Sequence, residues 1–214
     1  MDHTQRRLAG AAGILYFVTH VSSVAAVAAY GTGSAIGGVT LEFVLAISCV
    51  GTGVLLWALL REYGPARSAT FALLRAVEAS VIIAGTLPML ATTLVARSEE
   101  RFTVAASAMH AAAFLLGQGL IISVNTIVLG WLLWESRAVP RPLAILGVIG
   151  GIVVLTSNSA QLWNVIALNG VVAAIAAIPI FAFEIWLAVY LITVGLRVRR
   201  TPKLASRTGA LPAP

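Results

Sequence analysis

Charge is scarce in this sequence of 214 residues, of which only 10% are charged and 59% are hydrophobic. A typical soluble domain is about 25% charged and about 45–50% apolar. The mean hydropathy of +0.96 is also too high for a soluble fold of this length, whose interior is too small to bury so much apolar surface. The low charge therefore excludes a soluble protein and indicates that lipid surrounds most side chains.

Lysine and cysteine are nearly absent. The only lysine, Lys203, lies near the end of the sequence, which excludes a retinal Schiff base or another lysine-bound cofactor within the apolar runs. Cys49 is the only cysteine, so no disulfide forms within the chain, and its apolar surroundings favour a packing role. The sequence contains no P-loop, no GxSxG elbow and no HExxH motif. These absences exclude several common nucleotide-binding and hydrolytic sites.

Six apolar runs are present, and each is long enough to cross a bilayer, which takes about 20 helical residues. The predicted spans cover residues 8–30, 40–60, 71–96, 104–134, 143–162 and 170–196. The fourth is longer than one straight crossing requires, so we expect it to be tilted or to begin as an interfacial turn. The predicted fold class is an all-α integral membrane protein, a six-transmembrane-helix bundle forming one domain over residues 1–196.

Basic residues flank the runs mainly on one side of the predicted membrane. With the N-terminus inside, the outer loops hold only Arg97 and Arg101, beside two glutamates. The inner segments hold Arg6, Arg7, Arg61, Arg67, Arg137, Arg141, Arg197, Arg199, Arg200, Lys203 and Arg207. This asymmetry predicts that both termini are cytoplasmic. Because the basic residues form no separate domain, we expect no nucleic-acid partner, and residues 197–214 are predicted to be a basic disordered tail.

Ionisable residues inside the spans are the candidate functional residues, because they are costly in lipid and usually face the bundle interior or a wet cavity. Arg75 and Glu78 share one helix face in the third span. Asn125 in the fourth span and Glu184 in the sixth are predicted at a similar depth. We expect Glu78, Asn125 and Glu184 to converge between helices, with Arg75 beside them, in a site for an ion, a proton or a polar head group.

Structural roles are the alternatives for several of these residues. The long stem of Arg75 can reach the cytoplasmic interface, which would leave Glu78 as its helical ion-pair partner. Glu42, another ligand candidate, lies at the edge of the second span, where a carboxylate also favours the start of a helix. Asn125 and Gln118 are also typical of hydrogen bonds that hold membrane helices together.

Two histidines within the spans support a second hypothesis. His20 and His110 are predicted at comparable depths, so a bis-histidine haem is geometrically possible. A metal bound by His20, His110 and a carboxylate is a further possibility. The alternative is that each histidine bonds a backbone or hydroxyl group, such as Ser23 or Thr19 beside His20. No cofactor is required by the sequence.

Gly147 and Gly151 form a GxxxG pattern in the fifth span, with Gly150 beside them. Small residues at this spacing let two helices approach closely. We expect these glycines to pack helices together, and they are a candidate face for a homodimer.

Several short stretches lie in an order that matches one known family. They are RRLAG at 6–10, LE at 41–42, LRAVEA at 74–79, FLLG at 114–117, SRAVPRPLA at 136–144 with Gly147, and EIWL at 184–187 before Gly195. Together they resemble an uncharacterised bacterial family of six-helix membrane proteins, classed only as a domain of unknown function (DUF4386). The resemblance implies a six-span fold in a bacterial inner membrane. It also draws attention to Glu42, Arg75, Glu78 and Glu184, and it implies no settled activity.

Three functions remain open from the sequence. The first is a multi-pass protein that binds or transports a small molecule, lipid or ion through the intramembrane carboxylates. The second is an intramembrane metal- or haem-dependent enzyme that uses His20 and His110. The third is a membrane scaffold whose basic tail and inner loops contact anionic lipid or a partner.

Overall fold

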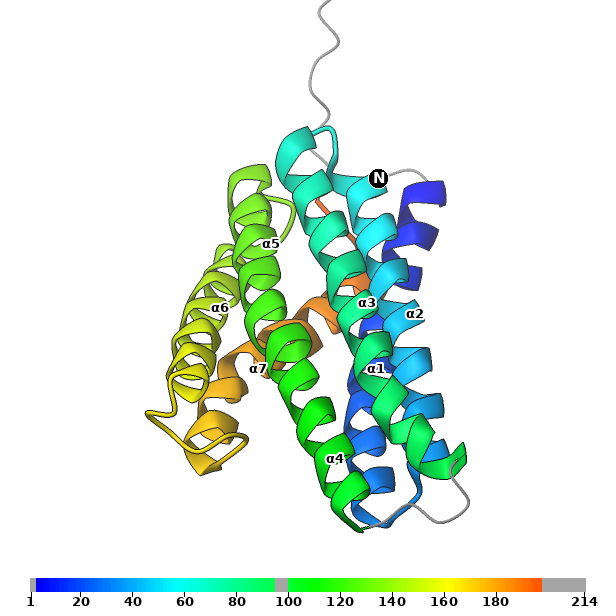
Figure 1. Ribbon diagram of the computed structural model, residues 1–214. Helices are drawn as coiled ribbons and strands as arrows, with labels where there is room; N and C mark the ends of the chain where they lie inside the picture. The colour runs from blue at the N-terminus through cyan, green and yellow to red at the C-terminus, as the bar shows by residue number, and fades with distance from the viewer. Residues whose placement is uncertain (1–2, 95–99, 198–214) are drawn as a thin grey trace, which may run out of the picture.

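The computed structural model describes residues 3–94 and 100–197, which are helical apart from short connections and contain no strand. Figure 1 shows the helices as one elongated bundle. The elements are α1 (His3–Gly31), α2 (Ala35–Leu60), α3 (Pro65–Leu94), α4 (Glu100–Phe114), the π-helical segment η1 (Leu115–Ile121), α5 (Ile122–Ser136), α6 (Arg141–Leu162) and α7 (Val171–Thr193). The all-α fold class is confirmed.

Six helices in the described part of the chain are long and apolar enough to cross a membrane. The fourth is continuous from Glu100 to Ser136, because α4, η1 and α5 follow one another without a break. The predicted six-span architecture is therefore confirmed, and the unusual length of the fourth apolar run comes from a helix of 37 residues.

Several helix ends differ from the predicted spans. The second and third helices begin at Ala35 and Pro65, earlier than predicted, because their first turns contain glycine, serine or arginine and are not apolar. The sixth span ends at Thr193 rather than Leu196, since Gly195 has a φ of 77° and its N–H donates to the carbonyl of Tyr190. Residues 95 and 96 of the third predicted span, and the predicted disordered tail after Arg197, lie outside the described residues.

Six helices form a closed ring of contacts, in the order α1, α2, α3, α5, α6 and α7, with α7 packing back on α1. The α4 segment lies outside this ring and packs mainly on α3 and η1. Figure 1 shows α4 diverging from α6 and α7 toward the end of the bundle that carries the α6–α7 connection. The bundle is therefore closed by helix packing in one half and less closed in the other.

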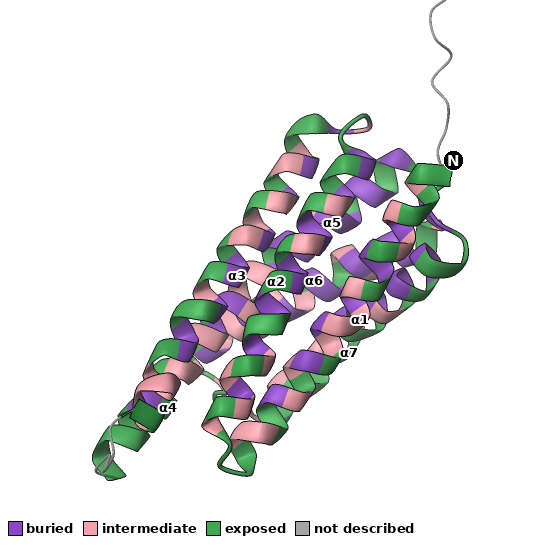
Figure 2. Cartoon of the chain, turned by 90° about the vertical axis from the view of Figure 1, so that its right-hand side faces the viewer, coloured by how far each residue is buried: buried purple, intermediate pink, exposed green. Residues whose placement is uncertain are grey.

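The hydrophobic core lies in the closed half. Its largest buried members come from six helices: Tyr16, Leu56, Leu60, Phe71, Leu129, Leu132, Leu133, Leu143, Phe183, Leu187 and Leu191. Many other large apolar side chains are exposed, such as Val21 at 67% and Leu73 at 67%. Figure 2 shows buried residues facing inward and exposed residues on the outer faces of the helices. An outer surface of this kind is suited to lipid.

Gly147, Gly150 and Gly151 are buried inside the chain. A Cβ atom on Gly147 would lie 2.7 Å from the Phe183 ring of α7, and one on Gly151 would lie 2.6 Å from Ile127 of α5. The GxxxG face therefore packs α6 against its own neighbours. The prediction that it forms a homodimer face is wrong for this reason, and a homodimer through another surface stays a prediction.

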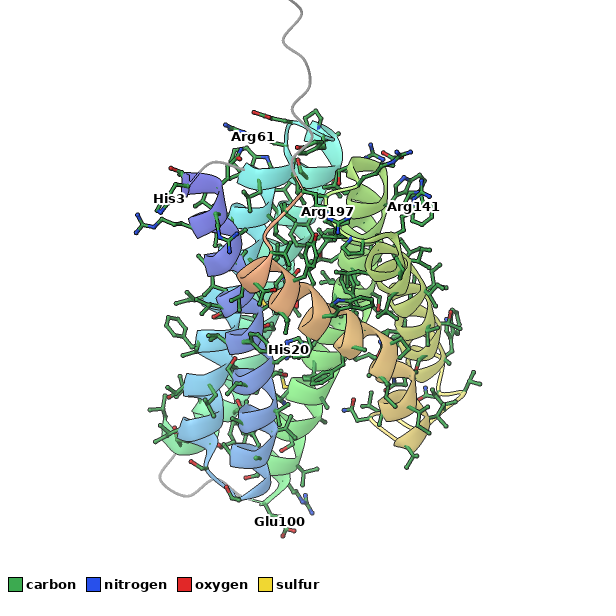
Figure 3. All side chains as sticks on the ribbon, turned by 180° about the vertical axis from the view of Figure 1, so that it is seen from behind. His3, His20, Arg61, Glu100, Arg141 and Arg197 are labelled. Atoms are coloured by element: carbon green, nitrogen blue, oxygen red, sulfur yellow. The ribbon has the colours of Figure 1, made fainter. Side chains whose placement is uncertain are left out.

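Basic residues gather at one end of the bundle. Figure 3 shows His3, Arg61, Arg141 and Arg197 at the same end, and Glu100 at the other. We call these the basic end and the opposite end. The arrangement supports the predicted orientation, in which the basic end is cytoplasmic.

Reporter fusions test this orientation. Alkaline phosphatase inserted after Gly33 or after Leu168, both in connections at the opposite end, is expected to be active because it reaches the periplasm. The same reporter fused after Gly64, at the basic end, is expected to be inactive. The reverse pattern would contradict the predicted topology.

Gly150 provides a test of the helix packing. A Cβ atom there would lie 2.9 Å from the backbone nitrogen of Ile180, whereas one on Gly10 would have no atom within 4 Å. Gly150→Ala is therefore expected to destabilise the protein by about 1–3 kcal/mol, measured by thermal unfolding in detergent. Gly10→Ala is the matched control and should be neutral or slightly stabilising. Equal stability of the two variants would contradict the contact between α6 and α7.

Candidate functional site

A buried ion pair lies near the middle of the bundle. Arg75 and Glu78, both on α3, are only 2% and 1% exposed. The Arg75 Nη1 atom lies 2.9 Å from Oε2 and 3.1 Å from Oε1 of Glu78. Because the residues are three apart in one helix, their side chains meet on the same face, as the sequence pattern predicts.

Neighbouring helices complete the surroundings of this pair. Arg75 Nε donates to Thr52 Oγ1 of α2 at 3.1 Å, and Asn125 Nδ2 of α5 donates to Glu78 Oε2 at 3.2 Å. Cys49 Sγ of α2 lies 3.8 Å from Glu78 Oε1, and the Tyr16 ring of α1 lies 5.3 Å from Arg75 Cζ. We call Arg75, Glu78, Thr52 and Asn125 the ionic centre. It connects α2, α3 and α5 within the apolar bundle.

The alternative in which Arg75 reaches the cytoplasmic interface is wrong, although Glu78 is its helical ion-pair partner as that alternative expected. The side chain points into the bundle because Gly53 on α2 leaves room for it and Thr52 supplies an acceptor. A Cβ atom on Gly53 would lie 3.0 Å from Arg75 Cβ. One face of α2 carries Cys49, Thr52 and Gly53. The sequence did not identify these residues as partners of a charged side chain, because small and weakly polar residues are common in membrane helices.

Glu184 does not join the ionic centre directly; it pairs with His20 of α1. The Nε2 atom of His20 lies 3.3 Å from Glu184 Oε2, and both side chains are about nine-tenths buried. His20 Nδ1 lies 2.9 Å from the carbonyl oxygen of Tyr16, and the Phe181 ring is 4.7 Å from the imidazole ring. Figure 3 shows His20 at mid-height in the bundle, beside α7. The predicted cluster of Glu78, Asn125 and Glu184 is thus divided between two neighbouring groups.

A second histidine–carboxylate pair lies nearer the opposite end. His110 Nε2 of α4 is 3.0 Å from both oxygens of Glu42 on α2. Tyr30 of α1 donates its hydroxyl to Glu42 Oε2 at 2.8 Å. Glu42 is 4% exposed. The reading of Glu42 as a helix-start carboxylate is wrong, because α2 begins at Ala35 and places Glu42 about two turns inside the helix.

The structure does not bring His20 and His110 together. His110 contacts Tyr30, which is ten residues from His20 along α1, or about 15 Å by helical rise. Among the described residues, no group of three or more histidine, cysteine or acidic side chains lies close enough to hold a metal. Each imidazole faces a carboxylate. In the described part of the chain, neither imidazole forms a hydrogen bond to a serine, threonine or cysteine side chain. The geometry therefore does not form the joint histidine site that the sequence suggested.

Two cavities adjoin these groups. The inner cavity, of about 200 Å³, is bordered by Thr19, His20, Ser23, Val24, Leu45, Cys49, Arg75, Glu78, Gln118, Ile122, Ala177, Ile180, Phe181 and Glu184. The outer cavity, of about 510 Å³, is bordered by Val27, Tyr30, His110, Ala111, Phe114, Gln118, Val154, Ser157, Asn158, Gln161, Asn169, Ala173, Ala174 and Ala177. Gln118 and Ala177 border both, so the cavities adjoin at these two residues.

Gln118 lies on the π-helical segment η1. Its Oε1 atom accepts a hydrogen bond from Ser23 Oγ of α1 at 3.0 Å. Gly119, next to it, allows Asn158 of α6 to approach, since a Cβ there would lie 2.9 Å from Asn158 Oδ1. Short π-helical insertions occur often at functional sites. The sequence favoured Gln118 as an amide that holds helices together, and its bond to Ser23 of α1 agrees with this. Its place between the two cavities was not predicted, because it depends on the π-helical turn.

Two residues that border the cavities each have a buried polar atom with no partner among the described residues: Arg75 Nη2 and Ser157 Oγ. An unpaired buried donor costs about 1–3 kcal/mol, and more if it is charged. Arg75 borders the inner cavity and Ser157 the outer one. Both atoms are themselves buried, so a bound molecule reaches either one only if the side chain moves.

The fold and these groups define a multi-pass helical membrane protein with ionisable side chains around an internal cavity. Residues 8–195 match the model of a family described as a domain of unknown function (DUF4386), so the chain belongs to that family. No curated protein and no solved structure matches the chain. The predicted family is confirmed, and the function has to be argued from the site.

Removing one partner of the ion pair tests the ionic centre. Arg75→Met is expected to lower the free energy of unfolding by about 3–5 kcal/mol, because Glu78 would stay buried and uncompensated. The double variant Arg75→Met with Glu78→Leu should regain most of that loss, since no buried charge remains. Thermal unfolding in detergent measures both.

The exposed Arg61 offers a matched control for this test. Its guanidinium lies 5.4 Å from the Trp57 ring at the basic end. Arg61→Met should cost less than about 1 kcal/mol. If Arg75→Met costs no more than Arg61→Met, the buried pair is not formed in the protein.

Proposed function

We propose that this protein binds, and carries across the membrane, a small amphipathic molecule in the two adjoining cavities. The observation that supports it best is that the Arg75–Glu78 and His20–Glu184 pairs border the inner cavity, which adjoins the larger, mainly apolar outer cavity. The polar end of the ligand would lie in the inner cavity and its apolar body in the outer one.

The polar groups of the inner cavity are held in place before any ligand arrives. Arg75 is fixed by Glu78 and Thr52, and Glu184 is held beside His20. Such preorganisation lowers the entropic cost of binding. The buried Nη2 atom of Arg75 has no partner among the described residues, and an oxygen atom of a ligand or a water molecule would supply one if the guanidinium turns toward the cavity.

The outer cavity suits an apolar body with a few hydrogen-bonding groups. Alanine, valine and phenylalanine side chains make up half of its lining, and Asn158, Gln161 and Gln118 supply amides. The amides of α6 are ordered, because Gln161 Nε2 donates to Asn158 Oδ1 at 3.0 Å and Gln161 Oε1 accepts from the Asn169 N–H at 2.8 Å. The second bond connects α6 to the residues before α7.

The shape of the bundle supports access from one side only. The outer cavity lies between α1, α4, α6 and α7, in the half where α4 diverges from α6 and α7 (Figures 1 and 3). The basic end is closed by the hydrophobic core of Leu56, Leu132 and Leu187. This arrangement is typical of a carrier loaded from the opposite end, and release on the other side would require the core helices to separate.

Native mass spectrometry of mildly extracted protein tests the binding site. Wild-type protein is expected to retain a bound small molecule. Ala177→Phe should reduce its occupancy about tenfold or more, because the larger side chain fills the junction of the cavities. Ala182→Phe is the matched control, since Ala182 is on the exposed face of the same helix. A wild-type spectrum of the chain alone, or equal occupancy in the two variants, would contradict the proposal.

A further inference from the structure

The charges at the inner cavity form two pairs, and one of them is fixed. Arg75 and Glu78 neutralise one another, since Nη1 contacts both carboxylate oxygens and Asn125 binds the same carboxylate. Neither residue gains or loses charge without breaking the ion pair that connects the helices. Any change in the charge of the cavity therefore falls on His20 and Glu184.

The contacts of His20 place an acceptor oxygen against each of its ring nitrogens. The Tyr16 carbonyl oxygen only accepts hydrogen bonds, so Nδ1 of His20 carries one proton. The other nitrogen, Nε2, lies 3.3 Å from Glu184 Oε2. Without a proton between them, a lone pair of His20 would face a carboxylate oxygen. A proton between Nε2 and Oε2 would complete a hydrogen bond from His20 to Glu184, and it is the proton that a bound cation could displace.

Few other titratable groups face this pair. They are Tyr16 on α1, Cys49 on α2, and the paired Arg75 and Glu78 on α3. The η1 and α5 segments contribute neutral residues to the inner cavity, Gln118 and Ile122, and α7 contributes Phe181 beside Glu184. With the proton present the inner cavity has no net charge, and without it the net charge is a single negative one.

We propose that the inner cavity binds a lipophilic organic cation in exchange for the proton of the His20–Glu184 pair. This inference rests on the proposed function and names its ligand class. The deprotonated cavity carries one negative charge, which a monovalent cation balances. An anion would need an unpaired positive charge, and the charge of Arg75 is already balanced by Glu78. The Phe181 ring lies 4.7 Å from the His20 ring and borders the same cavity, and an aromatic ring is a favourable contact for an organic cation.

The exchange leaves the total charge unchanged. The proton leaves Nε2 or Oε2 for water through the outer cavity, and the cation then pairs with the Glu184 carboxylate. Neutral His20 keeps its Nδ1–H bond to Tyr16 and still faces the site. The apolar part of the cation lies against the outer cavity, whose size exceeds that of the inner one.

Isothermal titration calorimetry of the full-length protein in lipid nanodiscs tests the inference, with tetraphenylphosphonium as the probe. Titrations in two buffers with different ionisation enthalpies give the number of protons released. We expect about one proton per cation bound, and an affinity that rises about tenfold per pH unit while the pair is protonated, because a released proton competes with the cation.

Two carboxylate variants locate the exchange. Glu184→Gln should weaken tetraphenylphosphonium binding at least about tenfold and abolish proton release. Glu135→Gln is the matched control and should behave as wild type, since Glu135 is an exposed carboxylate that pairs with Arg67 at the basic end. If Glu184→Gln does not fold, the buffer dependence of the wild-type protein still decides the question.

Neutral and anionic probes separate this inference from the proposed function. Binding of triphenylphosphine oxide or tetraphenylborate, with no binding of tetraphenylphosphonium, would overturn the cation inference and leave the cavity as a binding site. Binding of tetraphenylphosphonium without proton release would also overturn it. If none of the three probes binds, both proposals fail for molecules of this class.

Discussion

The Arg75–Glu78 ion pair is the constraint on which the structure depends. A lone charge in a bilayer costs about 2.5–3.5 kcal/mol or more, so each of these side chains has to be matched within the protein. The chain matches them with each other, with Thr52 on α2 and with Asn125 on α5. Because these hydrogen bonds are directional, they fix the rotation of three helices about the pair. Apolar contacts alone give little such orientation, since lipid competes equally well for apolar side chains.

The position of this pair divides the bundle into two unlike halves. Toward the basic end, large apolar side chains and close glycine contacts, such as Gly147 with Phe183, close the ring of helices. Toward the opposite end, the long fourth helix passes through the π-helical segment η1, and α4 diverges from α6 and α7. The cavities lie at this transition and extend toward the opposite end, and the charged groups border the inner cavity. A closed half and a more open half fit the proposed carrier, which would be loaded from one side.

The sequence predicted the fold well because hydrophobicity determines it. Six apolar runs became six spans, and the spacing of Arg75 and Glu78 correctly placed both on one face of α3. The sequence did not predict which helices meet, so it grouped Glu184 with Glu78 rather than with His20, and it left Glu42 at a helix start. Those pairings depend on the crossing of α7 over α1 and on the early start of α2. The sequence also did not predict which helix packs on Gly147 and Gly151, since a small-residue pattern does not reveal whether its partner helix is in the same chain.

An experimental structure of the protein in lipid nanodiscs tests the central claim most directly, namely that a buried ionic centre borders a ligand cavity. The account predicts Arg75 turned inward between Thr52 and Glu78, with density for a bound molecule that extends from Glu184 past Gln118 into the outer cavity. The contrary result is Arg75 turned toward the basic end with Glu78 unpaired, and side chains filling the space between α1, α4 and α7. That outcome would remove the charged site and the proposed function with it.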